Sequence, residues 1–379
     1  MNNPIKGYDV SNAVVYHYGK FPPAELNLNS LLKTLLRAAD ALSRYDQTLL
    51  NLPNCDLLLA PLKHSEAVIT SRLEGIFSTV DEVMAFDADT THETNITNTS
   101  QGREKVREVH QFTQILRYVQ DAISQGRTIN EVLIKNAHRI LLHSPREAKK
   151  RPGEYKMLQN YIGDNFRKVI HYTPINPSQL KSSMEKLFDY SENDETLPLL
   201  KVALIHVEFE ALHPFEDGNG RIGRLLITLL LWKYKLIHKP YFNMSAYFEE
   251  NKVQYCDLMR SVSSDNKWVE WTEFFLEAIA VQAERNLEIA QKIQSLYIEM
   301  KEPFRNITRS SWHTSVQDYI FERPIFRNKN LIKAGIPRHV APRITKALLE
   351  EGLLREVSPA RGSRGSLFAF EKLLEIVRV

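Results

Sequence analysis

The chain has 379 residues, of which 43% are hydrophobic and 25% are charged, and its formal net charge is +3. This composition is that of a folded protein of two to three domains, and it excludes a globally disordered chain. The small net charge excludes a whole-chain polyanion binder, although local basic patches remain possible. The most apolar stretch, residues 225–232, is far shorter than a membrane span, so no membrane contact is expected.

The two cysteines, Cys55 and Cys256, are too few for a disulfide framework and lack the spacing of metal ligands. Both are expected to be ordinary thiols in a reducing compartment. The first residues show no apolar segment behind a basic flank, which a secretory signal would require. We therefore expect a cytoplasmic protein.

The N-terminal region is predicted to be helical, because apolar residues recur there at intervals of three and four. Two prolines precede a helical pattern over residues 26–50, and a second pattern begins after Pro61 and stops at Gly75. Residues 87–104 are polar and rich in Thr and Asn, so they are predicted to be a loop at a domain boundary. Residues 1–105 are expected to form an N-terminal helical lobe.

The central region combines further helices with one short hairpin. Helical patterns over 106–123 and 129–142 lead into a segment whose prolines, glycines and β-branched pairs predict a β-hairpin. Two strongly apolar helical patterns follow, over 199–212 and 222–236, and enclose a polar loop that no core would require. The fold is therefore predicted to be mainly α, with a helical core over residues 106–300.

The C-terminal region is predicted to be a separate winged-helix-like domain over residues 311–379. A long helical pattern is expected to end near residue 300, and the passage EPFRNITRSSWH is typical of a linker. Helical segments over 316–322, 330–334 and 337–351 precede two predicted strands around a Gly-rich turn.

This C-terminal domain carries 12 Lys+Arg against 7 Asp+Glu, a net charge of +5. DNA contact is therefore possible, but the excess is modest, and such domains also serve as protein-docking or dimer modules. The cations expected on its recognition helix and wing are Arg338, Arg343, Lys346, Arg361 and Arg364.

The polar loop HPFEDGNGRIGR, residues 213–224, has the chemistry of a phosphate site. Gly218 and Gly220 allow successive N–H groups to converge on an anion at the positive end of the following helix. Asp217 is a hard oxygen ligand suited to Mg²⁺ that bridges phosphate oxygens. Arg221 and Arg224, one helical turn apart, can offer guanidinium groups to other phosphates.

His213 lies where the preceding helix meets this loop and can accept a proton from an attacking hydroxyl near neutral pH. Pro214 and Phe215 are expected only to shape the loop, the first by restricting the backbone and the second as a buried anchor. A lone GxG is usually a turn and a lone HPF is usually packing. Together, however, these residues predict a phosphate-handling site with its own base.

The loop matches the signature HxFx(D/E)GNGRxxR at every fixed position, so the chain resembles the Fic family. The resemblance implies a helical core with a β-hairpin flap and transfer of AMP from ATP to a protein hydroxyl, with release of pyrophosphate. It also implies that His213 is the base, that Asp217 binds Mg²⁺, and that Arg221 and Arg224 hold the distal phosphates. The other nucleotide-binding residues that it implies in this loop are Gly218, Asn219, Gly220, Ile222 and Gly223.

The resemblance extends to two further segments. Residues 168–176 would be the flap, where Ile170, His171 and Tyr172 would align an extended target segment by strand addition; the alternative is a plain surface hairpin. Family members often carry a Tyr-Tyr pair beside the adenine and ribose, and here the equivalent pair is Tyr255 and Cys256. This departure leaves the base preference open, and Cys256 is equally well explained as an ordinary buried thiol.

The segment from Thr70 to Gly75 fits the (S/T)xxxE(G/N) inhibitory pattern of many Fic proteins. Glu74 would pair with Arg224, occupy the place of the γ-phosphate and keep ATP from an in-line geometry, so autoinhibition is expected. Alternatively, Glu74 is only a helix-end charge and Thr70 only bonds the helix backbone. The same Glu74 could also hold a water for AMP removal, so the direction of the reaction stays open.

Three other functions are alternatives to AMP transfer. They are AMP removal at the same site, phosphoryl transfer with ATP bound in reverse, and a DNA-binding regulator whose Fic-like core is vestigial. The intact loop favours an AMP transferase that uses ATP and Mg²⁺. The expected partners are a protein target, which could be the chain itself, and a second copy in a homodimer; the target's identity stays open.

Overall fold

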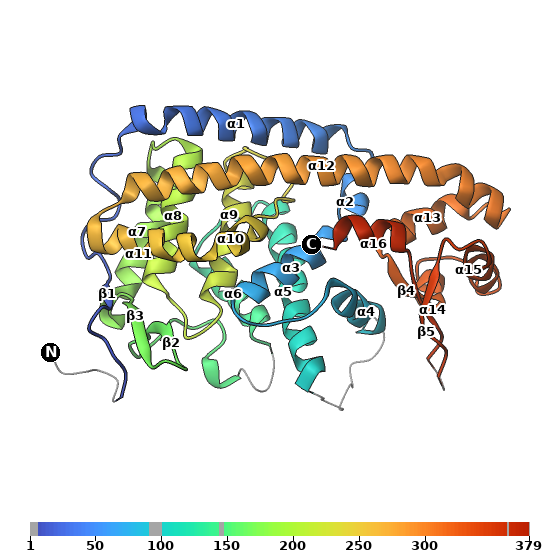
Figure 1. Cartoon of the computed structure of the whole chain (residues 1–379), viewed down its shortest axis with the longest axis horizontal. Coiled ribbons are helices and arrows are strands. Elements are labelled where there is room, and N and C mark those ends of the chain that lie inside the picture. The colour runs from blue at the N-terminus through green and yellow to red at the C-terminus, as the bar shows by residue number, and fades with distance from the viewer. Residues whose placement is uncertain (1–6, 91–100, 144–147, 362–363, 379) are drawn as a thin grey trace. The chain divides into compact units, whose positions relative to one another are not determined.

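The computed structural model describes residues 7–90, 101–143, 148–361 and 364–378, and it is mainly helical with two small sheets (Figure 1). The predicted fold class is confirmed. The chain divides into two compact units, each built from two stretches of sequence: Met1–Ser43 with Gln114–Ala283, and Arg44–Thr113 with Glu284–Val379. The division into residues 1–105, 106–300 and 311–379 stays a prediction.

The centre of the first unit is a pair of helices that are buried on nearly all sides. They are α8 (Pro198–Leu212) and α9 (Asn219–Lys233), which pack against each other, and only Pro198, Glu210, Trp232 and Lys233 lie outside the buried set. A helix that is apolar all round belongs in a core, as predicted. The surrounding helices are α6 (Glu131–Leu141), α7 (Pro177–Asn193), α10 (Ser245–Glu250), α11 (Lys252–Asp265) and the short η1 (Ala148–Lys150).

Three helices contribute residues to both units: α1 (Leu28–Asn51), α5 (Gln101–Ser124) and α12 (Trp268–Thr308). Within the first unit, the start of α1 runs beside the start of α12, where Arg37 pairs with Glu277 at 2.5 Å (Figure 1). None of the helices in the described part of the chain is long and apolar enough to cross a membrane.

A small three-stranded sheet flanks this core, with strand order β1 (Val14–Val15), β3 (Val169–Thr173), β2 (Ile162–Asp164). Strands β2 and β3 are antiparallel, as the predicted hairpin requires. The parallel strand β1 was not predicted, because two residues carry no periodicity. As a result, β3 has a neighbour on both sides.

A buried polar cluster fixes the residues after β1. Glu208 of α8 accepts the Tyr16 hydroxyl at 2.6 Å and lies 2.8 Å from His17 Nε2. The other ring nitrogen of His17 lies 2.7 Å from Ser263 of α11, and Tyr172 of β3 lies 3.0 Å from the same hydroxyl. This cluster ties the N-terminal segment, the hairpin and the core helices together.

The second unit combines an N-terminal group of helices with a C-terminal module, defined here as residues 313–377. Its first elements are α2 (Cys55–Leu58), α3 (Leu62–Leu73) and α4 (Val80–Thr90). The module follows the predicted winged-helix order, with β4 as an additional strand that makes an antiparallel sheet β4-β6-β5. Its elements are α13 (His313–Glu322), β4 (Ile325–Arg327), α14 (Asn328–Lys333), α15 (Ala341–Glu350), β5 (Arg355–Ser358), β6 (Leu367–Ala369) and α16 (Glu371–Val377).

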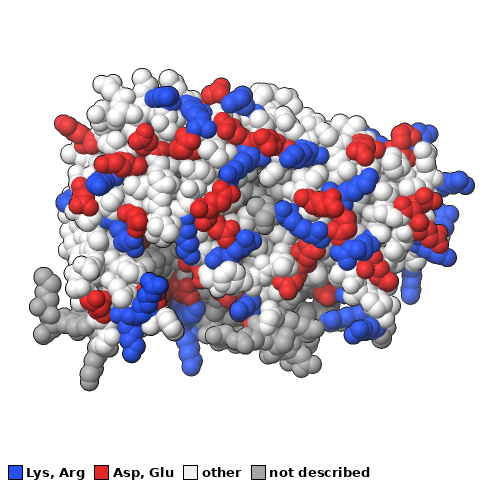
Figure 2. All heavy atoms as spheres, viewed as in Figure 1, with Lys and Arg blue, Asp and Glu red and all other residues white. Residues whose placement is uncertain are grey.

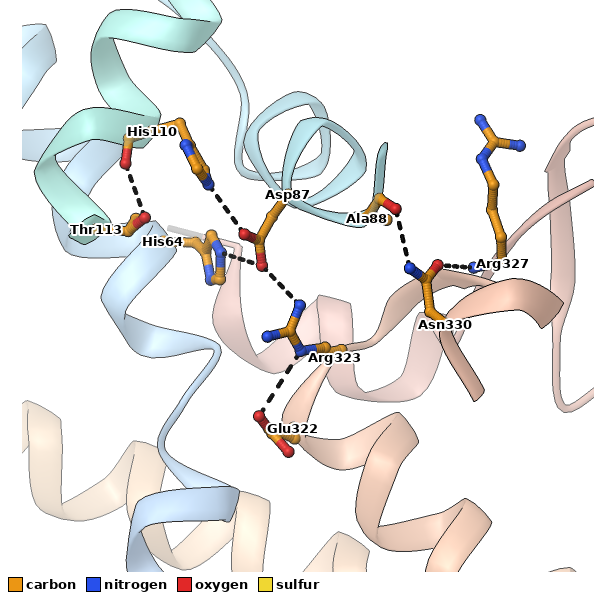
Figure 3. A network of polar contacts seen from close by, with 9 residues as sticks. All are labelled: His64, Asp87, Ala88, His110, Thr113, Glu322, Arg323, Arg327 and Asn330. Carbon is orange, nitrogen blue, oxygen red and sulfur yellow. Dashed lines mark hydrogen bonds and ion pairs between the residues drawn. The ribbon is translucent and has the colours of Figure 1, made fainter. Parts of the chain in front are cut away.

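A buried network joins the module to α3, α4 and α5 within this unit (Figure 3). Asp87 lies 2.9 Å from His110, 3.8 Å from His64 and 3.1 Å from Arg323. Burial alone would raise the pKa of Asp87, but these three neighbours hold it well below its usual range. Beside it, Arg327 pairs with Asp89 at 2.7 Å.

Two predictions of irregular segments are wrong. Helix α4 continues to Thr90 and α5 begins at Gln101, so only residues 91–100 of the expected loop 87–104 lie outside the described residues. Asp87 is polar because it belongs to the buried network. The expected linker after residue 300 is also helical as far as Thr308, because Met300 and Phe304 are buried and Pro303 removes only one backbone donor.

Candidate active site

The loop 213–224 joins α8 to α9 through two residues in left-handed backbone conformations. His213 directly follows α8 with φ 48°, and Gly218 directly precedes α9 with φ 78°. The left-handed region is uncommon for residues other than glycine, so His213 needs support from its surroundings. The predicted base therefore stands at a sharp turn of the backbone.

That support comes from the segment before the hairpin. Lys156 donates its backbone N–H to the carbonyl of Pro214 at 2.8 Å and its Nζ to the carbonyl of Leu212 at 3.0 Å. Asn160 donates to the carbonyl of His213 at 3.1 Å. Burial lowers the pKa of Lys156 to about 7, because no carboxylate accompanies the amine. Lys156 and Asn160 were not predicted, since side chains that hold backbone carbonyls leave no sequence pattern.

Asn219 closes the loop on itself. Its side-chain amide accepts the N–H of Phe215 at 2.8 Å and donates to the carbonyl of Phe215 at 2.9 Å. Phe215 is fully buried, as its predicted anchor role requires. The amide of Asn219 is thus engaged in holding the loop, and its backbone N–H is one of the first-turn donors of α9.

His138 of α6 holds the other side of the loop and was also missed. Its ring stacks on Phe215 with centroids 3.8 Å apart, its Nδ1 accepts the N–H of Gly153 at 2.8 Å, and its Nε2 lies 2.9 Å from the carbonyl of Asp217. Burial lowers the pKa of His138 to about 4, so the ring is neutral at pH 7 and carries its proton on Nε2. Nothing in the sequence distinguishes it from an ordinary core histidine.

The first turn of α9 has the backbone geometry that the predicted anion site requires. Ile222 donates its N–H to the carbonyl of Gly218 at 3.1 Å, so the N–H groups of residues 219–221 are the first-turn donors that precede the helical ladder. A Cβ on Gly218 would lie 2.9 Å from Leu141, which together with its positive φ explains the glycine. The backbone here can hold a phosphate.

Asp217 already faces cations. Its carboxylate pairs with Lys150 and accepts the N–H of Gly218 at 2.6 Å. Burial would raise the pKa of Asp217, but Lys150 and Arg221 hold it below its usual value, so the group is ionised at pH 7. One ionised carboxylate beside a phosphate cradle fits Mg²⁺, which usually binds one or two carboxylates together with substrate phosphates. Lys150 is a further residue that the motif did not reveal.

The two loop arginines point into the protein. Arg221 is 1% exposed and Arg224 is 4% exposed. The charge of Arg221 acts on Asp217, and that of Arg224 acts on buried His206. The structure therefore brings Arg221 beside the predicted metal ligand.

The predicted pair Tyr255 and Cys256 divides between two environments. Tyr255 is buried, stacks on Phe248 with centroids 4.3 Å apart, and its hydroxyl lies 2.8 Å from His206 Nε2. His206 in turn lies 3.1 Å from the carbonyl of Gly223, and burial lowers its pKa to about 3. Tyr255 therefore supports the backbone of α9 through His206.

Cys256 instead lines a cavity of about 100 Å³. Burial raises the pKa of its thiol. The cavity lies between the hairpin, α8 and α11. The predicted flap therefore lies beside the predicted pocket for the adenine base. Its other lining residues are Ile162, His171, Tyr172, Val207, Glu210, Ala211, Met259 and Arg260.

Glu210 links this cavity to the loop. A Cβ on Gly223 would lie 2.1 Å from Glu210 Oε1 and 3.2 Å from Phe209. The Glu210 carboxylate ends a flexible side chain that can move aside, so the Phe209 ring is the tighter limit on a larger residue at position 223. Ile222 is fully buried beside it, so its place in the loop is one of packing.

The hairpin residues alternate as a half-buried strand should. Ile170 and Tyr172 are buried, whereas His171 is exposed and contributes to the cavity. Direct strand addition to β3 is not available in this structure, because β1 and β2 occupy both of its edges. The outer edges of the sheet belong to β1 and β2.

Thr70 and Glu74 lie at the end of α3, where Thr70 is fully buried, Glu74 is exposed and Gly75 follows with φ 80°. Gly75 thus ends the helix as predicted. Both residues belong to the second unit, whereas Arg224 belongs to the first. The contact between Glu74 and Arg224 stays a prediction.

Comparison with known proteins agrees with this site. Residues 128–231 match the model of the Fic/DOC family, and residues 32–121 match the model of the N-terminal region of that family. The protein adenylyltransferase Fic of Nematostella vectensis is 32% identical over 133 residues, which are 33% of this chain and 28% of that protein. The protein adenylyltransferase fic-1 of Caenorhabditis elegans is 30% identical over 84 residues, which are 21% of this chain and 15% of that protein. The matched stretches thus span well under a third of these relatives.

Solved structures share the fold. A Fic family protein from Desulfovibrio desulfuricans superposes with a TM-score of 0.56 at 18% identity and covers 92% of this chain and 98% of its own. A Fic domain-containing signaling protein from Bacteroides thetaiotaomicron gives a TM-score of 0.53 at 21% identity and covers 68% and 97%. With both family models matched and the signature loop at the junction of α8 and α9, the chain is a Fic/DOC family protein that also carries the N-terminal region of this family.

Proposed function

We propose that this chain transfers AMP from ATP to a hydroxyl side chain of a protein. The observation that carries the proposal is the loop 213–224, whose backbone is held by Lys156, Asn160 and His138 so that a histidine and an anion cradle stand at its two ends. Such fixed geometry is what phosphoryl-centred transfer requires, since positioning and charge stabilisation supply most of the catalysis. Distant relatives named as protein adenylyltransferases support the same reaction.

The reaction balances with the groups of this site. His213 takes the proton of the target hydroxyl, whose oxygen forms a bond to the α-phosphorus of ATP. The bond from that phosphorus to the oxygen that bridges to the β-phosphate breaks, and pyrophosphate leaves with the electron pair. The N–H groups of residues 219–221 donate hydrogen bonds to the α-phosphate and stabilise its negative charge.

The remaining residues bind and orient the nucleotide. Asp217 would hold Mg²⁺, which when bound neutralises phosphate charge, and Lys150 and Arg221 add positive charge at the same place. The cavity beside Cys256 would accept part of the base or ribose. Its apolar lining residues suit a flat ring, and Glu210 and Arg260 in the same lining suit polar atoms of the base or ribose.

The test is incorporation of α-labelled ATP with Mg²⁺, compared with γ-labelled ATP, into the chain itself and into lysate proteins. Glu74→Gly should label strongly if Glu74 inhibits the site, and Glu74→Gly with His213→Ala should label at least about 1000-fold less. The matched control is Glu74→Gly with His143→Ala, which removes an exposed histidine of the same unit and should leave labelling unchanged.

Each alternative outcome contradicts one part of the proposal. Label from γ-labelled ATP alone would indicate phosphoryl transfer. Equal labelling of the wild type and Glu74→Gly would remove the inhibitory role of Glu74 and leave the transfer intact. Silence of Glu74→Gly on a lysate, together with release of AMP from a pre-modified protein, would reverse the direction of the reaction.

A further inference from the structure

The C-terminal module presents a helix on its surface in the manner of DNA-binding proteins. Helix α14 is followed by a turn at Gly335, where φ is 97°, and then by α15, and Thr345 of α15 donates to Asn328 of α14 at 2.9 Å. Helix α15 buries Ala341, Ile344 and Leu348 completely. Its opposite face therefore points to solvent.

That outward face carries cations at its N-terminal end. Arg343 and Lys346 lie one turn apart on α15 and are exposed, and Arg338 and His339 are exposed in the segment that enters the helix. The acidic residues of this face, Glu350 and Glu351, stand at its C-terminal end. The basic residues of the exposed face therefore lie on the N-terminal half of α15.

The turn between β5 and β6 adds two further arginines. Arg361 and Arg364 are exposed, and each donates its backbone N–H to the carbonyl of the other, at 2.9 and 3.0 Å. These reciprocal bonds fix the backbone from which both side chains project. The turn and α15 are therefore two basic elements of one module.

The ion pairs separate these arginines from the others of the module. Other arginines each face a carboxylate: Arg323 faces Asp87 and Arg327 faces Asp89 on α4, and Arg355 faces Glu371 within the module. Arg378, just beyond the module, faces Asp81. Within the described residues, Arg338, Arg343, Arg361 and Arg364 have no carboxylate within 4 Å, so their charge is not balanced by the protein.

The charged surface alone would not reveal this. Figure 2 shows Lys and Arg interspersed with Asp and Glu across the visible face, as expected from the near-neutral composition. The distinction lies in which cations are paired. Lys346 lies 3.7 Å from Glu350, but both side chains are largely exposed, so this pair contributes little.

We propose that α15, Arg361 and Arg364 form a binding surface for double-stranded DNA. An α-helix fits the major groove, helix-turn-helix proteins contact the bases with the N-terminal residues of the second helix, and arginines on a neighbouring turn are attracted to the minor groove or the phosphates. Unpaired guanidinium groups at the N-terminal half of α15 and on the turn supply the matching charge. This proposal does not depend on AMP transfer.

A protein partner would need a different surface. Protein interfaces are centred on buried aromatic or aliphatic anchors. Among the described residues of the module, Val357 is the one large hydrophobic side chain that is more than a third exposed, at 39%. The exposed face of α15 offers charge and no such anchor, which favours a polyanion.

The test is fluorescence anisotropy of a labelled 30-base-pair duplex of mixed sequence with the full chain, at 50 and 200 mM KCl. If four cations contact phosphates, the affinity should fall on the order of 100-fold between these salt concentrations. Arg343→Ala with Lys346→Ala should weaken binding at 50 mM at least about 10-fold and make the salt dependence shallower by about two phosphate contacts. Both side chains are exposed, so the melting temperature of this variant should equal that of the wild type.

The matched control is Lys181→Ala with Lys186→Ala on α7, which removes the same charge from exposed positions of the first unit and should leave binding unchanged. An equal loss in this control would show unspecific attraction and overturn the proposal. Absence of duplex binding at 50 mM would do the same and would favour a protein partner for the module. Equally tight binding of a single strand of the same length would contradict insertion of α15 into a groove.

Discussion

Two buried polar networks, one in each unit, neutralise their charges in opposite ways. Around the candidate active site, Lys156 meets only backbone carbonyls and an amide oxygen, and burial lowers its pKa to about 7. In the second unit, Arg323 meets the carboxylate of Asp87, whose pKa stays well below its usual range (Figure 3). The network at the candidate site fixes the backbone of the loop 213–224. The network in the second unit joins segments that are distant in sequence.

This difference follows from what each region has to present. A nucleotide site needs open N–H groups and few competing carboxylates, so neutral or weakly charged side chains hold its carbonyls. The junction with the C-terminal module has no ligand to admit, and paired charges there fix one arrangement of helices. Changes in the loop network should therefore reduce activity more than stability, and changes in the second network should reduce stability more.

Asp87→Asn should give the largest loss of stability. It leaves Arg323 and two histidines without their shared carboxylate in a buried place, which should lower the free energy of unfolding by about 3–5 kcal/mol at pH 7. The folded-state pKa of Asp87 lies below its unfolded value of 3.8, so this stabilisation is present above pH 3.8 and is lost as the pH falls further. Urea unfolding at pH 7 and pH 3 measures the difference.

The control for this variant is Glu299→Gln, which removes an exposed partner of Lys372 in the same unit. It should change stability by less than about 0.5 kcal/mol. A loss for Asp87→Asn that is as small as that of the control, or one that does not shrink at pH 3, would show that the network is not a stabilising junction.

His138→Phe should reduce activity more than stability. The phenyl ring can still stack on Phe215, but the N–H of Gly153 and the carbonyl of Asp217 lose their partner, which should lower the free energy of unfolding by about 2–3 kcal/mol. Displacement of the loop should reduce AMP labelling about 100-fold in a Glu74→Gly background. His143→Phe, at an exposed position, serves as the control. If His138→Phe retains its labelling, His138 does not hold the loop in its active geometry.

Helix periodicity predicted most of the fold. The core helices expected over 199–212 and 222–236 are Pro198–Leu212 and Asn219–Lys233, because an apolar helix in a core is specified by its own residues. Strand β1 was missed because its two residues are defined by pairing with β3, more than 150 residues further along the chain. The polar end of α4 was missed for the same reason, since the partners of Asp87 lie on other elements.

The residues of the candidate site also fall into two groups, those that a sequence pattern predicts and those that it does not. The motif located His213, Asp217 and the glycines, because their chemistry depends on residue type at fixed spacing. Lys156, Asn160 and His138 bind backbone groups, which every residue has, so their contacts cannot be inferred from spacing. The motif therefore predicts candidate groups for the chemistry, but it does not predict the residues that hold the loop.

Alkylation of Cys256 sharpens the comparison at the cavity. The chain has two cysteines, and Cys55 is buried in the second unit, so a Cys55→Ser variant leaves one reactive thiol beside the proposed base pocket. ATP with Mg²⁺ should slow its modification by a maleimide about 10-fold, and inorganic pyrophosphate should not, because it lacks the base. Because burial raises the pKa of this thiol, the unprotected rate should still be rising above pH 8.5. If pyrophosphate protects Cys256 as well as ATP does, the adenine base binds outside this cavity.

Lys156→Met tests the loop network through a change in pH dependence. The folded-state pKa of Lys156, about 7, lies below the ordinary 10.5, so between these values the unfolded chain binds more protons than the folded chain. Stability should therefore rise with pH across this window, by up to about 1.4 kcal/mol per pH unit, and the burial penalty should be complete below pH 7. Lys156→Met should lose this slope, whereas Lys181→Met at an exposed position should keep it. Urea midpoints at pH 6, 7.5 and 9 distinguish the two, and an unchanged slope in Lys156→Met would mean that the amine stays charged and that the loop, like the second unit, is held by a cation.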